Sequence, residues 1–296
     1  MFQGSIVALV TPMHSEGAVD FQRLQDLLDW HIQKKTDALV ILGTTGESAT
    51  LNTAEQCEII KVVLTQVRGR LPVIVGTGTH CTQTSLERTR LAKELGADAC
   101  LLVTPYYNRP TQEGLYQHYY RIAHQVAIPQ ILYNIPKRTG CDLMPDTVMR
   151  LANLPNIIGI KEGQRDRAEE IIQRCGKHFS VFSGDDDTAL AIMRIGGKGV
   201  ISVAANVIPD RMKKLSDLIL QGNFSAAEKL DQQLKPVYQQ LMIETNPIPV
   251  KWILSQLGLI ASGIRLPLTE LSQEHHEKMR TTVLSLTSIG EVPKRS

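Results

Sequence analysis

Residues 38–76, ALVILGTTGESATLNTAEQCEIIKVVLTQVRGRLPVIVG, contain the unit that decides the fold. A short apolar run, Ala38–Gly43, opens this stretch, and a second run, Pro72–Gly76, closes it. Apolar runs with little alternation are typical of strands that are buried on both faces. Between the two runs, apolar residues recur at the 3,4 spacing of an amphipathic helix: Ile59, Ile60, Val63, Leu64 and Val67. The stretch therefore predicts a strand, a crossover helix and a parallel strand.

The same rhythm continues along the chain. Eight apolar runs are predicted as strands: Ser5–Val10, Ala38–Gly43, Pro72–Gly76, Ala99–Thr104, Gln130–Asn134, Ile157–Lys161, Ser180–Gly184 and Gly199–Val203. Helical spacing fills the intervals, and Asp20, Thr53 and Asp187 are predicted helix N-caps because their side chains accept hydrogen bonds from helix N-termini. For Thr53, the following residues also fit a capping box. Eight such units predict a (β/α)8 TIM barrel over residues 1–222 as the catalytic domain.

An open, doubly wound sheet is the alternative fold. It requires a reversal of strand order and usually carries a phosphate-binding fingerprint at that point. The nearest match, Gly76–Thr77–Gly78, has Cys81 where the third glycine belongs, and Gly197–Lys198 is followed by glycine rather than Ser or Thr. The barrel is therefore favoured, and the glycine pair is interpreted as a tight strand exit.

The strand signal stops near residue 222. Helical patterns follow at Phe224–Leu241, Pro249–Leu257 and Thr269–Leu286. They are too few to form a separate core easily, so residues 223–296 are predicted to be a C-terminal helical extension packed on the barrel.

Composition limits the possible partners and the compartment. With 32 Lys and Arg against 30 Asp and Glu, the net charge of +2 provides no basic field for nucleic acid. No apolar run approaches the roughly 18 residues that span a membrane, and the N-terminus lacks the pattern of a signal peptide. The five cysteines are scattered without a CxxC pair, which is typical of reduced thiols. We expect a cytoplasmic protein that binds neither nucleic acid nor membranes.

Lys161 is the most informative candidate for chemistry. Active sites of such barrels lie at the carboxyl ends of the strands, and Lys161 ends the apolar strand Ile157–Lys161. Burial disfavours an ammonium, and a neutral amine can attack a carbonyl to form a Schiff base. The alternative is an ion pair with Glu162 or another carboxylate at the barrel mouth, and the residue pattern alone leaves both open.

Other strand ends supply groups that suit this chemistry. Tyr133 ends the preceding strand, and its hydroxyl can both donate and accept the protons that Schiff-base formation moves. Thr44 and Thr45 can orient that hydroxyl or bind a carboxylate, and the guanidinium of Arg138 suits bidentate capture of a carboxylate. Packing roles for the Tyr and Thr residues and a solvated surface position for Arg138 remain the alternatives.

Two clusters are interpreted as structural. Asp185–Asp187 lacks a His or a further carboxylate at ligand spacing, so we expect helix capping rather than a metal site. His275 and His276 lie in a charged helical pattern and are expected on an exposed face.

Long motifs match one known family closely. They are GSIVALVTPM (Gly4–Met13), GTTGESATLN (Gly43–Asn52), VTPYYNRPTQEGLYQHY (Val103–Tyr119), QILYNIPKRTGCDL (Gln130–Leu143), IIGIKE (Ile157–Glu162), SGDD (Ser183–Asp186), GVISV (Gly199–Val203) and NPIPVKW (Asn246–Trp252). Together these motifs resemble the dihydrodipicolinate synthase family of class I pyruvate-dependent aldolases, over nearly the whole chain.

The resemblance implies a lyase of lysine and diaminopimelate biosynthesis. Lys161 would form a Schiff base with pyruvate, and the resulting enamine would attack the aldehyde of L-aspartate 4-semialdehyde. Tyr133 would carry protons, and Thr44 would link it to Tyr107, which the family donates across a tight-dimer interface. By the same resemblance, pyruvate would be held by Thr45 and the backbone of Val203, and Arg138 would bind the carboxylate of the semialdehyde at the entrance. No metal or organic cofactor is expected.

Assembly and regulation are also implied by the family. Its members suggest a homotetramer built from tight dimers. Those that are inhibited by lysine bind it in a cleft at the dimer interface, where Ser48, Ala49 and Tyr106 fit the lysine-binding pattern. Four positions depart from that pattern: Thr53, Gln56, His80 and Thr84. Thr84 lacks the carboxylate that would pair with the ammonium of the effector, so we expect weak or absent inhibition by L-lysine.

Two alternative functions remain open. One is another pyruvate-dependent aldolase, such as N-acetylneuraminate lyase, which shares the Schiff-base Lys. The other is a catalytically silent barrel that senses a ligand. Arg138 argues against the first. The second is disfavoured by the complete set Thr44, Tyr107, Tyr133, Arg138 and Lys161.

Overall fold

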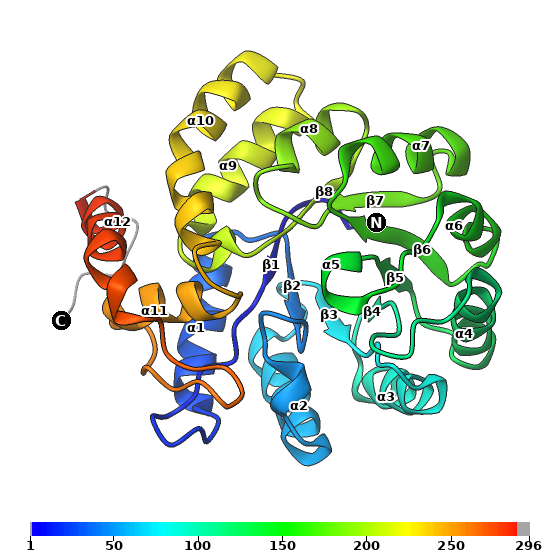
Figure 1. The fold of residues 1–296 in the computed structure, drawn as a ribbon, viewed down its shortest axis with the longest axis horizontal. Coiled ribbons are helices and arrows are strands. Elements are labelled where there is room, and N and C mark those ends of the chain that lie inside the picture. Colours follow the sequence, from blue (N-terminus) through cyan, green and yellow to red (C-terminus); the bar gives the residue numbers. More distant parts are fainter. Residues whose placement is uncertain (1, 289–296) are drawn as a thin grey trace.

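A closed barrel of eight parallel strands forms the centre of the computed structural model, which describes residues 2–288 (Figure 1). The strands pair in sequence order, and β8 closes on β1. They are β1 (Gly4–Ala8), β2 (Ala38–Ile41), β3 (Val73–Gly76), β4 (Ala99–Val103), β5 (Gln130–Tyr133), β6 (Ile157–Glu162), β7 (Ser180–Ser183) and β8 (Gly199–Ser202). Every predicted strand is present, so the barrel is confirmed and the open sheet is excluded.

A ring of helices surrounds the barrel (Figure 1). The main ones are α1 (Phe21–Gln33), α2 (Thr53–Val67), α3 (Thr82–Leu95), α4 (Gln112–Gln125), α6 (Pro145–Ala152), α7 (Arg165–Cys175), α8 (Ala189–Arg194) and α9 (Pro209–Leu220). Three short elements sit in loops after strands: η1 (Ser48–Thr50), α5 (Pro136–Thr139) and η2 (Ala204–Asn206). Apolar side chains fill two layers. One lies inside the barrel and includes Ile6, Ile74 and Phe182, and the other lies between strands and helices. The strands are thus buried on both faces, which is why their sequences do not alternate.

Close packing explains why positions 76 and 78 are glycines. A Cβ on Gly76 would lie 2.1 Å from the carbonyl oxygen of Leu42, and one on Gly78 would lie 2.4 Å from the amide nitrogen of Val103. Both distances are shorter than real Cβ contacts allow. The motif therefore lets three loops at strand exits pass close together.

Two of the three predicted helix caps are wrong. Asp20 caps α1 as expected and accepts a hydrogen bond from the amide of Arg23. The cap of α2 is Asn52 rather than Thr53, because Asn52 and Glu55 form the reciprocal capping box. Thr188, not Asp187, precedes α8, and its side chain makes no capping bond.

The extension consists of α10 (Phe224–Leu241), α11 (Ile248–Gln256), η3 (Gln273–His275) and α12 (His276–Ser288). The third helix was expected from Thr269 but begins later, because the backbone is still extended at Ser272, whose amide donates to Glu244. His275 and His276 are half-buried rather than exposed, and the His276 ring lies 5.1 Å from that of Trp252. Among residues 2–288, no helix has the length and apolarity to cross a membrane.

Candidate active site

Lys161 and Tyr133 lie side by side at the carboxyl ends of β6 and β5. They are partners in the parallel register, and Nζ of Lys161 lies 4.4 Å from the centre of the Tyr133 ring. Lys161 is only 5% exposed. Within residues 2–288, its nitrogen makes no hydrogen bond or ion pair, so the pairing with Glu162 that the sequence left open is not formed. A buried amine without a protein partner is free to meet a ligand.

The loop after β2 places its two threonines differently. Thr44 lines a cavity of about 40 Å³ together with Tyr133, Gly78 and other residues at the strand ends. Thr45 is buried and turns toward the C-terminal extension, where its hydroxyl accepts a hydrogen bond of 2.9 Å from the amide of Asn246. The structure thus brings Thr44 to Tyr133, while Thr45 is held by a residue for which the sequence predicted no role.

Arg138 lies at the edge of the mouth on α5. The residue is exposed, and Nη2 donates to the carbonyl oxygen of Asn246 at 3.1 Å. One guanidinium edge is thereby fixed, while no ion pair within the described residues occupies the rest of the fork. This position suits a group that meets a carboxylate from solvent.

Val203 and Tyr107 fit the expected site less directly. Val203 uses both its backbone groups within the chain: its amide donates to Asp186, and its carbonyl oxygen accepts from the backbone and side-chain nitrogens of Asn206. Tyr107 is 92% exposed, so a single chain does not enclose its side chain in the Lys161 site.

Asp186 has a role that the sequence did not reveal. It was expected, with its neighbours, to cap a helix, but its carboxylate instead accepts from the Ser202 hydroxyl and from the amides of Val203 and Ala204. Burial raises the pKa of Asp186 to about 6, although these hydrogen bonds and the nearby Lys161 act to lower it. The helix-capping interpretation is wrong for Asp186, because its partners lie on the exit of β8. Among the residues described, no group of three or more His, Cys, Asp or Glu side chains is placed to hold a metal ion.

The extension is tied to the barrel mouth by a buried ion pair between Lys251 of α11 and Glu47. Lys251 and Glu47 are 3% and 1% exposed at their side chains, and burial lowers the pKa of Lys251. Glu47 follows the Thr44–Gly46 turn, and it also accepts a hydrogen bond from the amide of Arg265. The pair therefore anchors the loop that carries both threonines.

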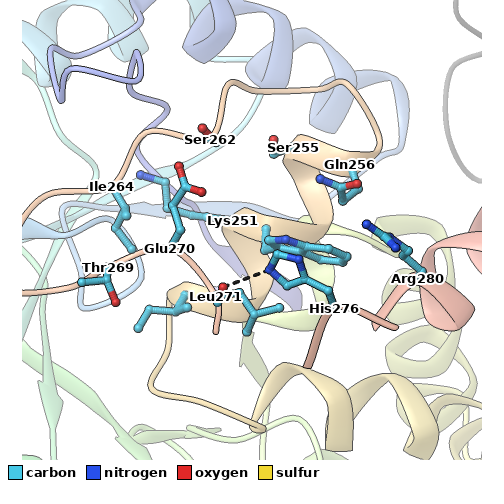
Figure 2. A pocket seen from close by; sticks show the side chains of 12 residues that line it. Lys251, Ser255, Gln256, Ser262, Ile264, Thr269, Glu270, Leu271, His276 and Arg280 are labelled. Atoms are coloured by element: carbon cyan, nitrogen blue, oxygen red, sulfur yellow. Dashed lines mark hydrogen bonds between the residues drawn. The ribbon is translucent and has the colours of Figure 1, made fainter. Parts of the chain in front are cut away.

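A larger cavity of about 220 Å³ lies beside Lys251, outside the barrel mouth (Figure 2). It is enclosed by α11, the segment before η3, and α12, and Figure 2 shows His276 and Arg280 reaching it from the α12 side. None of the predicted site residues lines it. The site for chemistry is therefore the barrel mouth.

Comparison with known proteins places the chain in a family. The model of the dihydrodipicolinate synthetase family matches residues 1–286. The chain belongs to this family. A 4-hydroxy-tetrahydrodipicolinate synthase from Nitrosococcus oceani is 56% identical over 282 residues, which cover 95% of this chain and 97% of that protein.

Solved members of the family have the same fold. The chloride-inhibited dihydrodipicolinate synthase from Acinetobacter baumannii, in complex with pyruvate, has a TM-score of 0.95 and 47% identity, with 98% of this chain and 100% of that chain covered. The Aquifex aeolicus dihydrodipicolinate synthase has a TM-score of 0.95 and 45% identity, with 99% and 100% covered. The family membership that the motifs implied is confirmed.

Proposed function

We propose that this chain is a 4-hydroxy-tetrahydrodipicolinate synthase that condenses pyruvate with L-aspartate 4-semialdehyde through a Schiff base on Lys161. The observation that carries the proposal is the buried, unpartnered amine of Lys161 against Tyr133 at the carboxyl end of the barrel. The names of its relatives and the pyruvate bound to the Acinetobacter baumannii enzyme support the choice of substrates.

The first half of the reaction joins pyruvate to the enzyme. The neutral amine of Lys161 adds to the ketone carbon, and the carbinolamine loses water to give an iminium. The cationic nitrogen of the iminium accepts the electron pair of a methyl C–H bond. The methyl proton is therefore lost, and the enamine forms. Tyr133 carries the protons of these steps, because its hydroxyl can accept one and return it.

The second half forms the carbon–carbon bond and releases the product. The enamine carbon attacks the aldehyde carbon, and the alkoxide that forms takes a proton. The amino group of the semialdehyde then attacks the iminium carbon, which closes the ring and expels the Lys161 amine. Arg138 at the entrance holds the carboxylate of the semialdehyde.

The roles of the remaining site residues follow from these reaction steps. Thr45 has a hydroxyl hydrogen left to donate to the pyruvate carboxylate, because Asn246 uses only an acceptor site of its oxygen. The backbone of Val203, at the exit of β8, contacts the bound pyruvate, while its carbonyl oxygen keeps its hydrogen bonds from Asn206. Thr44 connects Tyr133 to Tyr107 of a second copy, and the exposure of Tyr107 in one chain supports such an exchange.

The proposed assembly is a cytoplasmic homotetramer of two tight dimers, acting in lysine and diaminopimelate biosynthesis. We assign residues 1–222 to the catalytic barrel domain and residues 223–296 to an extension, of which residues 289–296 lie outside the described part of the chain. The described part braces the barrel mouth through Asn246 and Lys251.

Borohydride reduction in the presence of pyruvate tests the proposal. We expect the peptide that contains Lys161 to gain the mass of one reduced pyruvyl group, and Lys161→Ala to gain none. A coupled assay with both substrates should then show condensation. Trapping without condensation, together with cleavage of N-acetylneuraminate, would identify a lyase instead, and absence of trapping would indicate a silent barrel.

A further inference from the structure

The residues that follow Tyr133 and Lys161 form a polar network on the opposite side of the strands. Successive side chains of a strand point to opposite faces, so Asn134 and Glu162 face away from the barrel interior. Both are buried, at 2% and 1% exposure. They join the ends of β5 and β6 just behind the two reactive groups.

Asn134 uses its backbone and side-chain N–H groups in this network. Its backbone amide donates to the carbonyl oxygen of Lys161 at 3.1 Å. Its side-chain amide donates one bond to Glu162 and one to Asp142, each of 2.9 Å, and its amide oxygen accepts from the backbone of Leu143 at 3.0 Å. One residue therefore links both strand ends to the segment that leads into α6.

Arg167 of α7 completes the network. Its guanidinium binds Asp142 through two bonds of 2.5 and 2.6 Å and lies 3.5 Å from Glu162. The second oxygen of Glu162 accepts from the amide of Gln164. Burial raises the pKa of Glu162, while the hydrogen bond from Asn134 and the charge of Arg167 act to lower it. Two carboxylates thus meet one guanidinium, and the Asn134 amide donates to both of them.

We propose that Asn134 is a positioning residue that holds Tyr133 in register with Lys161 for proton transfer. This inference rests on the proposed function, because the spacing of Tyr133 and Lys161 matters for the rate only if they exchange protons in that reaction. A misplacement of about 1 Å can cost on the order of 100-fold in rate. An amide is required because it donates twice, whereas a carboxylate of the same size would accept.

The variant Asn134→Asp tests this directly, because it keeps the shape and replaces the two donors with a third carboxylate. We expect kcat to fall by about 100-fold near pH 8. As the pH falls toward 6, a proton shared with Glu162 or Asp142 restores one hydrogen bond, since neighbouring carboxylates raise each other's pKa. The ratio of variant to wild-type kcat should therefore rise as pH falls. The charged groups around position 134 are Glu162, Asp142 and Arg167, with Lys161 on the inner face.

A swapped pair provides the matched control. Asn134→Asp combined with Asp142→Asn keeps the composition and net charge and restores a donor between the two side chains. We expect a partial regain of kcat over Asn134→Asp alone, because the amide at position 142 donates to the carboxylate at position 134, while that carboxylate still faces Glu162 and Arg167 loses its bidentate partner. Asn134→Ser retains one donor and adds no charge, so its kcat should be intermediate with no pH-dependent recovery. It serves as the second variant if Asn134→Asp does not fold.

The outcomes separate the positioning role from the proposed function. Suppose that the wild-type protein traps pyruvate on Lys161. The positioning role alone is then overturned if Asn134→Asp has the kcat of the wild type. It is also overturned if the deficit in kcat is constant with pH and is not relieved by the swap. A wild-type protein that traps no pyruvate overturns the proposed function and the positioning role with it.

Discussion

Replacement of Lys251 by methionine should destabilise the protein strongly. The change removes the ammonium from a pair in which both side chains are at most 3% exposed. The Glu47 carboxylate then keeps a hydrogen bond of 3.3 Å from the amide of Arg265 but has lost its ion-pair partner. Leaving one charge of a buried pair without its partner costs about 3–5 kcal/mol of the free energy of unfolding. At about 2 °C per kcal/mol for a chain of this size, the melting temperature should fall by roughly 6–10 °C.

A double-mutant cycle in urea measures the coupling of the two side chains. Methionine at both positions 47 and 251 removes both charges, and such replacements are often neutral or stabilising by about 1–4 kcal/mol. We therefore expect the double variant to recover most of the loss. Lys34→Met is the matched control, because its partner Asp210 is 42% exposed and such pairs contribute about 0–1 kcal/mol. A Lys251→Met variant within 1 kcal/mol of the Lys34→Met control would refute the reasoning.

Three further outcomes are expected. Because the folded pKa of Asp186 is raised to about 6 from 3.8, the contribution of this group to stability should fall by about 3 kcal/mol as the pH rises from about 4 to 6, so the difference in urea unfolding between wild type and Asp186→Asn should change by that amount over this range. L-Lysine should inhibit weakly in a coupled assay, because Thr84 offers no carboxylate and the side-chain amide of Gln56 already donates to two backbone carbonyls; submillimolar half-maximal inhibition would contradict this. Gly78→Ala should lose about 1–3 kcal/mol in thermal unfolding, since its Cβ would lie 2.4 Å from the Val103 amide, and an unchanged melting temperature would disprove that contact.

The barrel and the central pair of the site could be predicted from local sequence. Strands buried on both faces leave continuous apolar runs, and consecutive strands of a parallel barrel are neighbours. The ends of adjacent runs therefore had to meet, which brought Tyr133 beside Lys161. Both inferences use information that lies within a few residues of each strand.

The braces of the site could not be predicted in this way. Lys251 lies 204 residues from Glu47, and Asn246 lies 201 residues from Thr45, so no periodic signal joins them. Asp186 looked like a helix cap because its acidic neighbours lead into α8, but its carboxylate accepts from groups 16 to 18 residues later. Such pairings depend on how distant segments fold over the barrel mouth, which composition and spacing do not record.

Strand alternation explains why reactive and supporting residues are neighbours in this sequence. At the carboxyl end of a strand, one residue points into the mouth and the next points outward, where it reaches the surrounding loops and helices. Tyr133 and Lys161 are therefore each followed by a polar residue whose hydrogen bonds are made behind the strand. The two residues are joined by one peptide bond, so hydrogen bonds that fix the outward residue also fix the backbone of the inward one. The inward group then stays free of protein partners, which a nucleophilic amine requires, while its position is still held. Loss of an outward residue should accordingly affect rate through geometry, although it touches no reacting atom.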